Sequence, residues 1–239
     1  MNRDEAILRE LNLYPLWKTR EQVAAAPPIP EAAPAGPTVA EAEVPVVEKS
    51  REQILGDLGW PELKSMVRDC TACKLRAGCT QTVFGVGDEQ ADWLFVGEGP
   101  GADEDARGEP FVGQAGKLLD NMLLAIKLKR GNRVYIANIV KCRPPGNRTP
   151  EADEIAACMP YLQRQVALIR PKIIVALGKT AATALLGREA TLASLRGKLH
   201  DFAGIPLIIT YHPAYLLRTP LDKAKAWQDL CLAVQTING

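Results

Sequence analysis

Length, composition and charge narrow the class of protein. The chain has 239 residues, 47% of them hydrophobic and 24% charged, with a net charge of +1, which suits one sizeable soluble domain with room for an appendage. No apolar run approaches the roughly 20 residues that span a bilayer, and the first residues carry acids where a signal peptide has a basic block. We therefore expect a cytoplasmic protein without membrane association.

The cysteines and the charge distribution narrow the class of protein further. A disulfide framework is not expected of six cysteines in a reducing compartment, where closely paired cysteines favour metal or redox chemistry. Residues 1–50 hold five Lys or Arg against eight Asp or Glu, so the basic excess lies in the rest of the chain. A bound metal and a basic surface are thus both expected after residue 50.

The sequence divides into three regions. Residues 1–20 place apolar side chains at roughly helical spacing, which predicts a short amphipathic segment. Residues 21–50 are rich in Pro and Ala and bury too little apolar surface to offset chain entropy, which predicts a disordered, extended linker. Residues 51–239 carry the patterns of a folded domain.

Within that domain, short apolar runs alternate with helical patterns. The expected strands are 93–96, 134–140, 172–177 and 206–210. The expected helices are 115–127, 151–169, 179–186 and 222–234. Thr149 and Pro150 are expected as N-cap and first residue of the second helix. Continuous apolar strands suit a parallel sheet covered on both faces. We therefore predict an α/β fold, a three-layer α/β/α sandwich around a mainly parallel four-stranded sheet.

Ligands in such folds gather beyond the carboxyl ends of the strands. Gly97, Asn138, Gly178 and His212 all fall there. An amide inside an apolar run, such as that of Asn138, costs free energy unless it pairs with a ligand or with backbone. A satisfied core amide and a structural histidine are the alternative interpretations of Asn138 and His212.

A glycine-rich loop at 97–101 follows the first expected strand and allows close approach of backbone to a ligand. Its acids, Glu98 and the nearby Glu104 among them, would repel a phosphate. They suit activation of a water molecule or stabilisation of a cationic transition state. An ordinary strand-to-helix turn with solvated acids is the alternative.

Four cysteines can supply a metal centre. Cys70 and Cys73 form a C-x2-C pair, and Cys142 and Cys158 follow much later. Such a set could hold a [4Fe-4S] cluster or a tetrahedral zinc ion, and spacing does not choose between them. Cys79 lies close enough to Cys73 to compete as a ligand, so the choice of four stays open at this point.

Three cations, Lys141, Arg143 and Arg148, surround a turn-rich segment between Cys142 and Cys158. This segment is either a solvated loop or a DNA-facing surface held in shape by the metal centre. Its position between two metal-ligating residues favours the second interpretation.

Several motifs, taken in chain order, closely resemble those of the family-4 uracil-DNA glycosylases over about residues 55–239. They are Cys70-x2-Cys73, Val83-Phe84-Gly85-x-Gly87, Gly97-Glu98-Gly99-Pro100-Gly101, Pro110-Phe111-Val112-Gly113, Asn138-x-x-Lys141-Cys142-Arg143-Pro144-Pro145, Cys158 and His212-Pro213-Ala214. The resemblance implies a monofunctional enzyme that flips uracil out of DNA, hydrolyses its glycosidic bond and so starts base-excision repair. U·G mispairs should be favoured, because a mispaired base costs less to flip.

The resemblance also implies the ligand set of a [4Fe-4S] cluster. Its ligands would be Cys70, Cys73, Cys142 and Cys158, with Cys79 as a bystander.

The resemblance further assigns roles at the uracil site. Phe111 would stack on the flipped base, and Asn138 would read its edge by donating to O4 and accepting from N3–H. His212 would donate to O2 as negative charge develops on the base. Glu98 and Glu104 match the acidic positions that orient the attacking water. Gly99 of the glycine loop is expected to complete the uracil-binding set.

The segment that follows His212 resembles a loop that wedges into the duplex. Leu216 or Leu217 would fill the space left by the flipped base, with Arg218 assisting.

Residues 10–14 loosely resemble peptides that bind replication sliding clamps, and such a tether would raise the local concentration of the enzyme at DNA. A helix that docks on the protein's own core and a dispensable tail are the alternatives.

We expect a monomer. Two other function classes are a metal-stapled nucleic-acid-binding module of the same fold without catalysis and an iron-sulfur oxidoreductase, which the acidic glycine loop disfavours.

Overall fold

The computed structural model describes residues 50–238. The expected amphipathic segment at 1–20, the linker up to residue 49 and the clamp-binding peptide at 10–14 lie outside the described residues and stay predictions. Among the helices within 50–238, none is long and apolar enough to cross a membrane.

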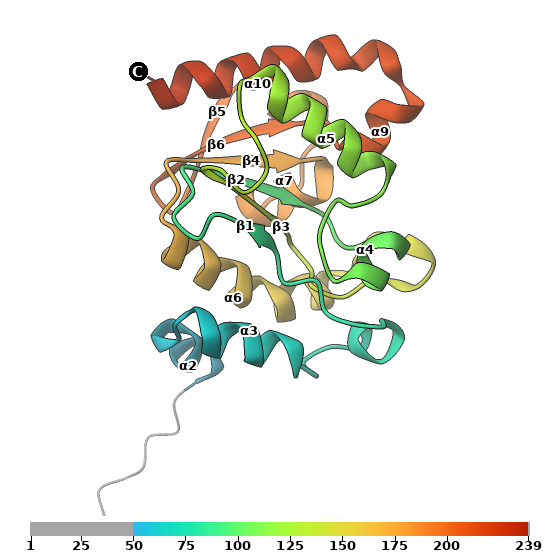
Figure 1. Cartoon of the computed structure of the whole chain (residues 1–239), viewed down its shortest axis with the longest axis vertical. Coiled ribbons are helices and arrows are strands. Elements are labelled where there is room, and N and C mark those ends of the chain that lie inside the picture. The colour runs from blue at the N-terminus through green and yellow to red at the C-terminus, as the bar shows by residue number, and fades with distance from the viewer. Residues whose placement is uncertain (1–49, 239) are drawn as a thin grey trace, which may run out of the picture. The chain divides into compact units, whose positions relative to one another are not determined.

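A six-stranded sheet in the order β1-β3-β2-β4-β6-β5 forms the centre of this region (Figure 1). The four expected strands make up its parallel core, as β2 (Trp93–Gly97), β3 (Val134–Asn138), β4 (Ile173–Leu177) and β6 (Ile205–Thr210). Every residue of β2, β3 and β4 is buried, as expected of parallel strands covered on both faces.

The predicted sheet was two strands too small. β1 (Val86–Gly87) pairs antiparallel with β3, and β5 (Leu199–Phe202) pairs antiparallel with β6. β1 has two residues, and β5 alternates exposed with partly buried residues. Neither carries the continuous apolar run that revealed the other four strands.

Helices cover both faces of the sheet, which confirms the α/β/α sandwich (Figure 1). α5 (Gln114–Ala125) and α10 (Lys223–Asn238) cover one face, where Leu119, Leu123 and Leu230 pack with Phe95 of β2. α6 (Ala152–Ile169) and α7 (Lys179–Leu186) pack on the other face. α2 (Arg51–Asp57) and α3 (Trp60–Arg68) lie against α6. The remaining short elements are η1 (Lys74–Gly78), α4 (Ala102–Arg107), η2 (Pro145–Asn147), α8 (Leu192–Leu195), α9 (Pro213–Arg218) and η3 (Pro220–Asp222).

The start of α6 differs from the predicted one. The helix begins at Ala152 with Glu151 as its N-cap, so Thr149 is not the cap and Pro150 lies before the helix. The Glu154 carboxylate accepts a hydrogen bond from the Glu151 N–H (2.8 Å). The acid in the first turn of the helix thus satisfies a free backbone donor that we had assigned to threonine.

The parallel core strands place their carboxyl ends at one edge of the sheet. Gly97 pairs in register with Asn138 on the adjacent strand, and the turns after β4 and β6 lie beside them because β2, β4 and β6 are consecutive neighbours. The residues expected to bind a ligand therefore converge on this edge.

Candidate active site and cysteine cavity

A cavity of about 510 Å³ opens at the carboxyl ends of β2, β3 and β6. Its walls are formed by Glu98, Gly99, Pro100, Gly101, Glu104, Phe111, Ala115, Asn138, Pro144, Asn147, Arg148, Thr149, His212, Ala214, Tyr215 and Arg218. The structure thus brings together every residue expected to bind uracil or take part in catalysis, although these residues lie on four separate segments of the chain.

Asn138 ends β3 with its amide held beside the cavity wall. The residue is 2% exposed, and its Oδ1 is a buried side-chain atom without a hydrogen-bond partner among the described residues. A Cβ on Gly97, across the strand pair, would stand 2.4 Å from this oxygen, so glycine is needed there. A Cβ on Gly99 would stand 2.8 Å from the Val140 side chain. A buried amide oxygen left unpaired in this way is suited to a donor on a ligand.

Phe111 supplies the aromatic wall. Its ring lies 5.5 Å from the His212 ring, centroid to centroid, and its backbone adopts φ 56°, a strained value for a non-glycine residue. Arg130 stabilises this conformation by donating to the carbonyl oxygens of Pro110 (2.9 Å) and Phe111 (2.8 Å). A Cβ on Gly116 would meet the same Phe111 carbonyl at 1.7 Å. The loop is therefore fixed from two sides.

His212 is the N-cap of α9, and its Nδ1 accepts a hydrogen bond from the Ala214 N–H (3.1 Å). Burial, with a smaller contribution from the charge of Arg218, lowers the pKa of His212 to about 4. The imidazole is therefore neutral at pH 7. Because Nδ1 is the acceptor, the proton lies on Nε2, for which no protein partner is found within 50–238. His212 can offer a neutral N–H donor to a ligand.

The two glutamates of the site have different surroundings. Glu104 Oε1 accepts from the N–H groups of Val112 (2.9 Å) and Gly113 (3.0 Å), and its Oε2 accepts from the Gly101 N–H (3.1 Å). Both of its oxygens are thus engaged in holding backbone. Glu98 Oε2 accepts from the Thr180 hydroxyl, while its Oε1 has no hydrogen-bond partner in the described part of the chain.

The structure corrects one of the three expected DNA-binding cations. Lys141 is 1% exposed, and its ammonium donates to the Asn138 carbonyl (2.9 Å) and to Gln165 Oε1 (2.7 Å). It lies in the interior and cannot contact DNA. Arg148 lines the cavity but forms a two-pronged ion pair with the buried Glu154 (2.8 and 2.7 Å).

Arg143 is the expected cation that keeps its charge at the surface. Its Nε donates to the neutral side chain of Asn147 (2.7 Å) at an exposed position. Of the three expected cations, Lys141 is therefore excluded from contact with DNA, whereas Arg143 and the partly exposed Arg148 stay predictions.

The predicted wedge, Leu216 or Leu217 with Arg218 assisting, is narrowed to one of the two leucines. The segment after His212 is the helix α9, so neighbouring side chains point in different directions. Leu216 is 1% exposed, whereas Leu217 is 44% exposed. Arg218 is exposed, lines the cavity and donates to the Ala214 carbonyl (3.0 Å). Leu217 and Arg218 are the members of this segment available to a ligand.

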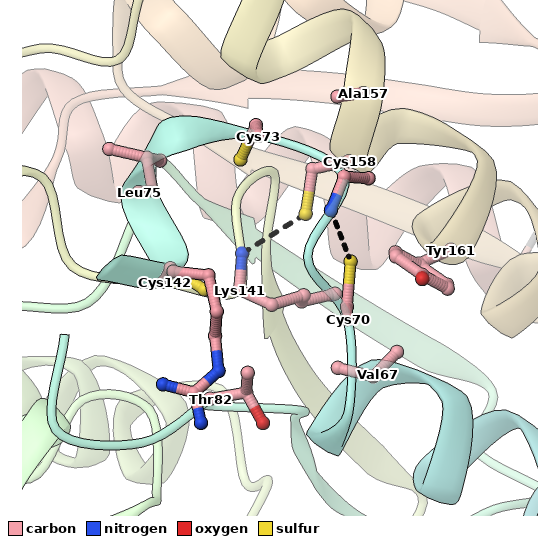
Figure 2. A pocket seen from close by; sticks show the side chains of 12 residues that line it. Val67, Cys70, Cys73, Leu75, Thr82, Lys141, Cys142, Ala157, Cys158 and Tyr161 are labelled. Carbon is pink, nitrogen blue, oxygen red and sulfur yellow. Dashed lines mark hydrogen bonds between the residues drawn. The ribbon is translucent and has the colours of Figure 1, made fainter. Parts of the chain in front are cut away.

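A second cavity is lined by four cysteines (Figure 2). Cys70 lies after α3, Cys73 precedes η1, Cys142 follows β3, and Cys158 is on α6. These are the four residues expected to hold the metal centre. Figure 2 shows their side chains entering one space from different segments.

Backbone donors surround the sulfur atoms. The Lys141 N–H donates to Cys158 Sγ (3.2 Å) and the Ala72 N–H to Cys70 Sγ (3.4 Å). Burial raises the pKa values of the Cys142 and Cys158 thiols. A positively charged metal centre would reverse this effect by stabilising the thiolates. The donor set, the backbone donors and the surrounding side chains fit a thiolate-ligated cluster.

Four thiolates are a donor set for either a [4Fe-4S] cluster or a single zinc ion. Among residues 50–238, no three His, Cys, Asp or Glu side chains meet in a group that could hold one metal ion. A lone zinc ion needs all four sulfurs about 2.3 Å from one point, whereas each thiolate of a [4Fe-4S] cluster binds its own iron. Cys79 does not line the cavity, although its thiol contacts that of Cys142.

The residues that support this site from behind were not predicted from the sequence. Arg130, Thr180, Gln165 and Glu154 contact site residues rather than the cavity itself. Arg130 and Gln165 lie in no recognisable motif, so no local pattern could have identified them. Gly97 and Gly178 belonged to the expected edge of the sheet, but nothing in the sequence indicated which side chains they make room for.

Comparison with known proteins agrees with this geometry. The profile of the Uracil DNA glycosylase superfamily matches residues 84–231. The chain is 42% identical to the type-4 uracil-DNA glycosylase of Pyrobaculum aerophilum over 72% of this chain and 91% of the relative. It is 47% identical to that of Thermotoga maritima over 64% and 80% of the two chains, and 44% identical to that of Archaeoglobus fulgidus over 64% and 81%. This chain therefore belongs to the uracil-DNA glycosylase superfamily and, within it, to the type-4 family.

Proposed function

We propose that this protein is a monofunctional uracil-DNA glycosylase that hydrolyses the bond between uracil and deoxyribose in DNA and so initiates base-excision repair. The buried, unpaired Oδ1 of Asn138 carries the proposal, because an enzyme that reads a pyrimidine edge must leave such an atom free for its substrate.

Recognition follows from the amide of Asn138. Its Oδ1 would accept from uracil N3–H and its Nδ2 would donate to O4. Cytosine presents an acceptor at N3 and donors at its exocyclic amine, so both bonds would be lost and buried polar groups would stay unpaired. The ring of Phe111 offers a stacking face to the flipped base.

Bond cleavage needs charge stabilisation at both ends of the breaking bond. As the C1′–N1 bond breaks, its electron pair goes to uracil, and the Nε2–H of neutral His212 would donate to O2 where negative charge develops. The positive charge on the sugar is then quenched when a water oxygen bonds to C1′ and releases a proton. The products are free uracil and an abasic site.

Of the two glutamates, Glu98 is the one suited to the water. Its Oε1 is free to accept from the water, whereas both oxygens of Glu104 hold backbone N–H groups of the loops that carry Gly101 and Phe111. Glu104 thus shapes the site rather than taking part in the reaction.

The decisive measurement is release of uracil from a duplex that contains one U·G pair. We expect release by the wild-type chain and an abasic product that is cleaved by alkali. Retention of DNA binding without release of uracil would instead support the non-catalytic nucleic-acid-binding module.

We further propose that Cys70, Cys73, Cys142 and Cys158 hold a [4Fe-4S] cluster. When bound, the cluster would cross-link the segments that carry these residues, two of which flank the loop at the mouth of the active-site cavity. The four cysteines that line one cavity, the backbone donors to two of their sulfur atoms and the resemblance to the type-4 family support a cluster.

Iron and labile sulfide analysis of anaerobically purified protein tests this assignment. We expect about four of each per chain, loss of both in Cys142→Ser, and retention in Cys79→Ser and Cys231→Ser. Zinc in place of iron in the wild type would contradict it.

The remaining proposals rest on the sequence. We propose that the enzyme works as a monomer in the cytoplasm and that residues 10–14 bind a sliding clamp. Deletion of residues 1–48 followed by a clamp-binding measurement tests the last point, and unchanged binding would end it.

A further inference from the structure

The carboxylate of Glu98 is held by a residue from another part of the chain. Thr180 Oγ1 donates to Glu98 Oε2 at 2.5 Å, across 82 positions of sequence. The contact exists because β2 and β4 are parallel neighbours. Glu98 follows the last residue of β2, and Thr180 is the second residue of α7, which follows β4 after a single glycine.

This hydrogen bond gives the two carboxylate oxygens of Glu98 different surroundings. Oε2 is occupied by a neutral donor, and Oε1 has no partner within 50–238 and belongs to a residue that lines the cavity. A glutamate side chain has several rotatable bonds, and holding one oxygen restricts where the other can point. A water molecule bound to Oε1 would then keep one position relative to the sugar.

The turn that carries Thr180 also lies against His212. Gly178 adopts φ 95°, and a Cβ at this position would stand 3.0 Å from His212 Cβ. The β4–α7 turn, residues 178–180, therefore contacts the glutamate and the histidine from behind. Thr180 itself does not line the cavity, so any effect that it has on the reaction must act through Glu98.

We propose that Thr180 is a positioning residue of the glycosylase, one that orients Glu98 toward the attacking water. This inference rests on the proposed function. It adds to the reaction a residue from the β4–α7 turn, which provides no other polar side chain to the site.

Three single variants separate this role from a structural one. Thr180→Val keeps the shape and removes the hydroxyl, Thr180→Ser keeps the hydroxyl, and Thr183→Val is the matched control. Thr183 lies on the same helix, and its hydroxyl bonds to the backbone oxygen of Thr180 (3.3 Å) rather than to Glu98.

From initial rates over a range of U·G duplex concentrations, we expect Thr180→Val to lower kcat by about 10- to 100-fold with KM unchanged, because a misplaced reacting group costs rate rather than binding. Thr180→Ser and Thr183→Val should stay within about threefold of the wild-type kcat. Equal kcat values for Thr180→Val and wild type would overturn the proposal.

A double-mutant cycle provides the second test. In a Glu98→Gln background, Thr180→Val should cause little further loss, since the group that it positions has already been changed. A full additional 10- to 100-fold loss in that background would show that Thr180 does not act through Glu98, and would also overturn the proposal. Failure of the wild type to release uracil would refute the proposed function instead.

If Thr180→Val does not fold, Thr180→Ala replaces it in both experiments. The thermal midpoint of each variant is measured beside its kcat, so that a loss of rate is interpreted for folded protein.

Discussion

The loop at 141–149 supplies part of the wall of the active-site cavity, yet its cations differ from the polar groups at the ends of β2 and β3 in having protein partners. In the loop, Lys141 and Arg148 are saturated by protein partners. In the cavity, Asn138 Oδ1 and Glu98 Oε1 have no hydrogen-bond partner within the described residues. An unpaired buried polar atom costs free energy, so the buried Oδ1 of Asn138 is best explained by a substrate that pairs with it. The four predictions below test this contrast between paired and unpaired groups.

The largest effect is expected at the unpaired amide. Asn138→Asp should lower the rate of uracil release by roughly 10³-fold, because the donor to O4 becomes an acceptor. Single-turnover excision from a U·G duplex measures it. Asn121→Asp on α5, outside the cavity, is the control and should retain the wild-type rate. A small effect at Asn138 would show that its free oxygen is not the uracil reader.

The second largest effect is expected on the pH dependence of the free energy of unfolding, through His212. Its pKa is lowered from 6.5 to about 4 in the folded chain, so between these pH values the unfolded state binds a proton that the folded state does not. The free energy of unfolding must therefore fall as pH drops through this window, by roughly 3 kcal/mol in total. His212→Asn keeps a capping side chain and should remove this contribution.

Urea unfolding of the wild type and of His212→Asn at pH 7, 5.5 and 4.5 measures how steeply the free energy of unfolding of each protein falls with pH. If His212→Asn loses stability on acidification as steeply as the wild type, the histidine is not buried in its neutral form.

A smaller effect should distinguish the two glutamates. Glu104→Gln replaces an acceptor of three backbone N–H groups and should cost about 1–2 kcal/mol in the free energy of unfolding. Glu98→Gln should change stability by less than about 0.5 kcal/mol while it lowers the rate. Chemical denaturation and excision rates of the two variants test the assignment, and the reverse pattern would exchange their roles.

The smallest effect is expected at the surface cation. Arg143→Gln should weaken DNA binding modestly and reduce the slope of log Kd against log salt by about one. Arg188→Gln, exposed beyond the far end of α7, should leave the slope unchanged. An unchanged slope for Arg143→Gln would mean that the loop at 141–149 does not contact phosphate at all.

Residue identity and local spacing were enough to predict the family and the main architecture. Apolar runs located the four parallel strands because buried strands need continuous apolar residues. The ordered motifs identified the family, the residues that line the cavity and the four cysteines around the second cavity. These features depend on residue identity and local spacing, which are visible in one dimension.

Which of those residues can contact a ligand depends on the tertiary fold. Lys141 looks like a DNA contact in the sequence, but its ammonium lies in the interior and bonds to Asn138 and Gln165. Leu216 and Leu217 look equivalent in the sequence, but the helix α9 places Leu216 in the core and leaves Leu217 exposed. Glu98 and Glu104 differ only through partners such as Thr180, brought from 82 positions away by the pairing of β2 with β4. Hydrogen-bond saturation and burial are set by long-range contacts, so these distinctions had no local signal to reveal them.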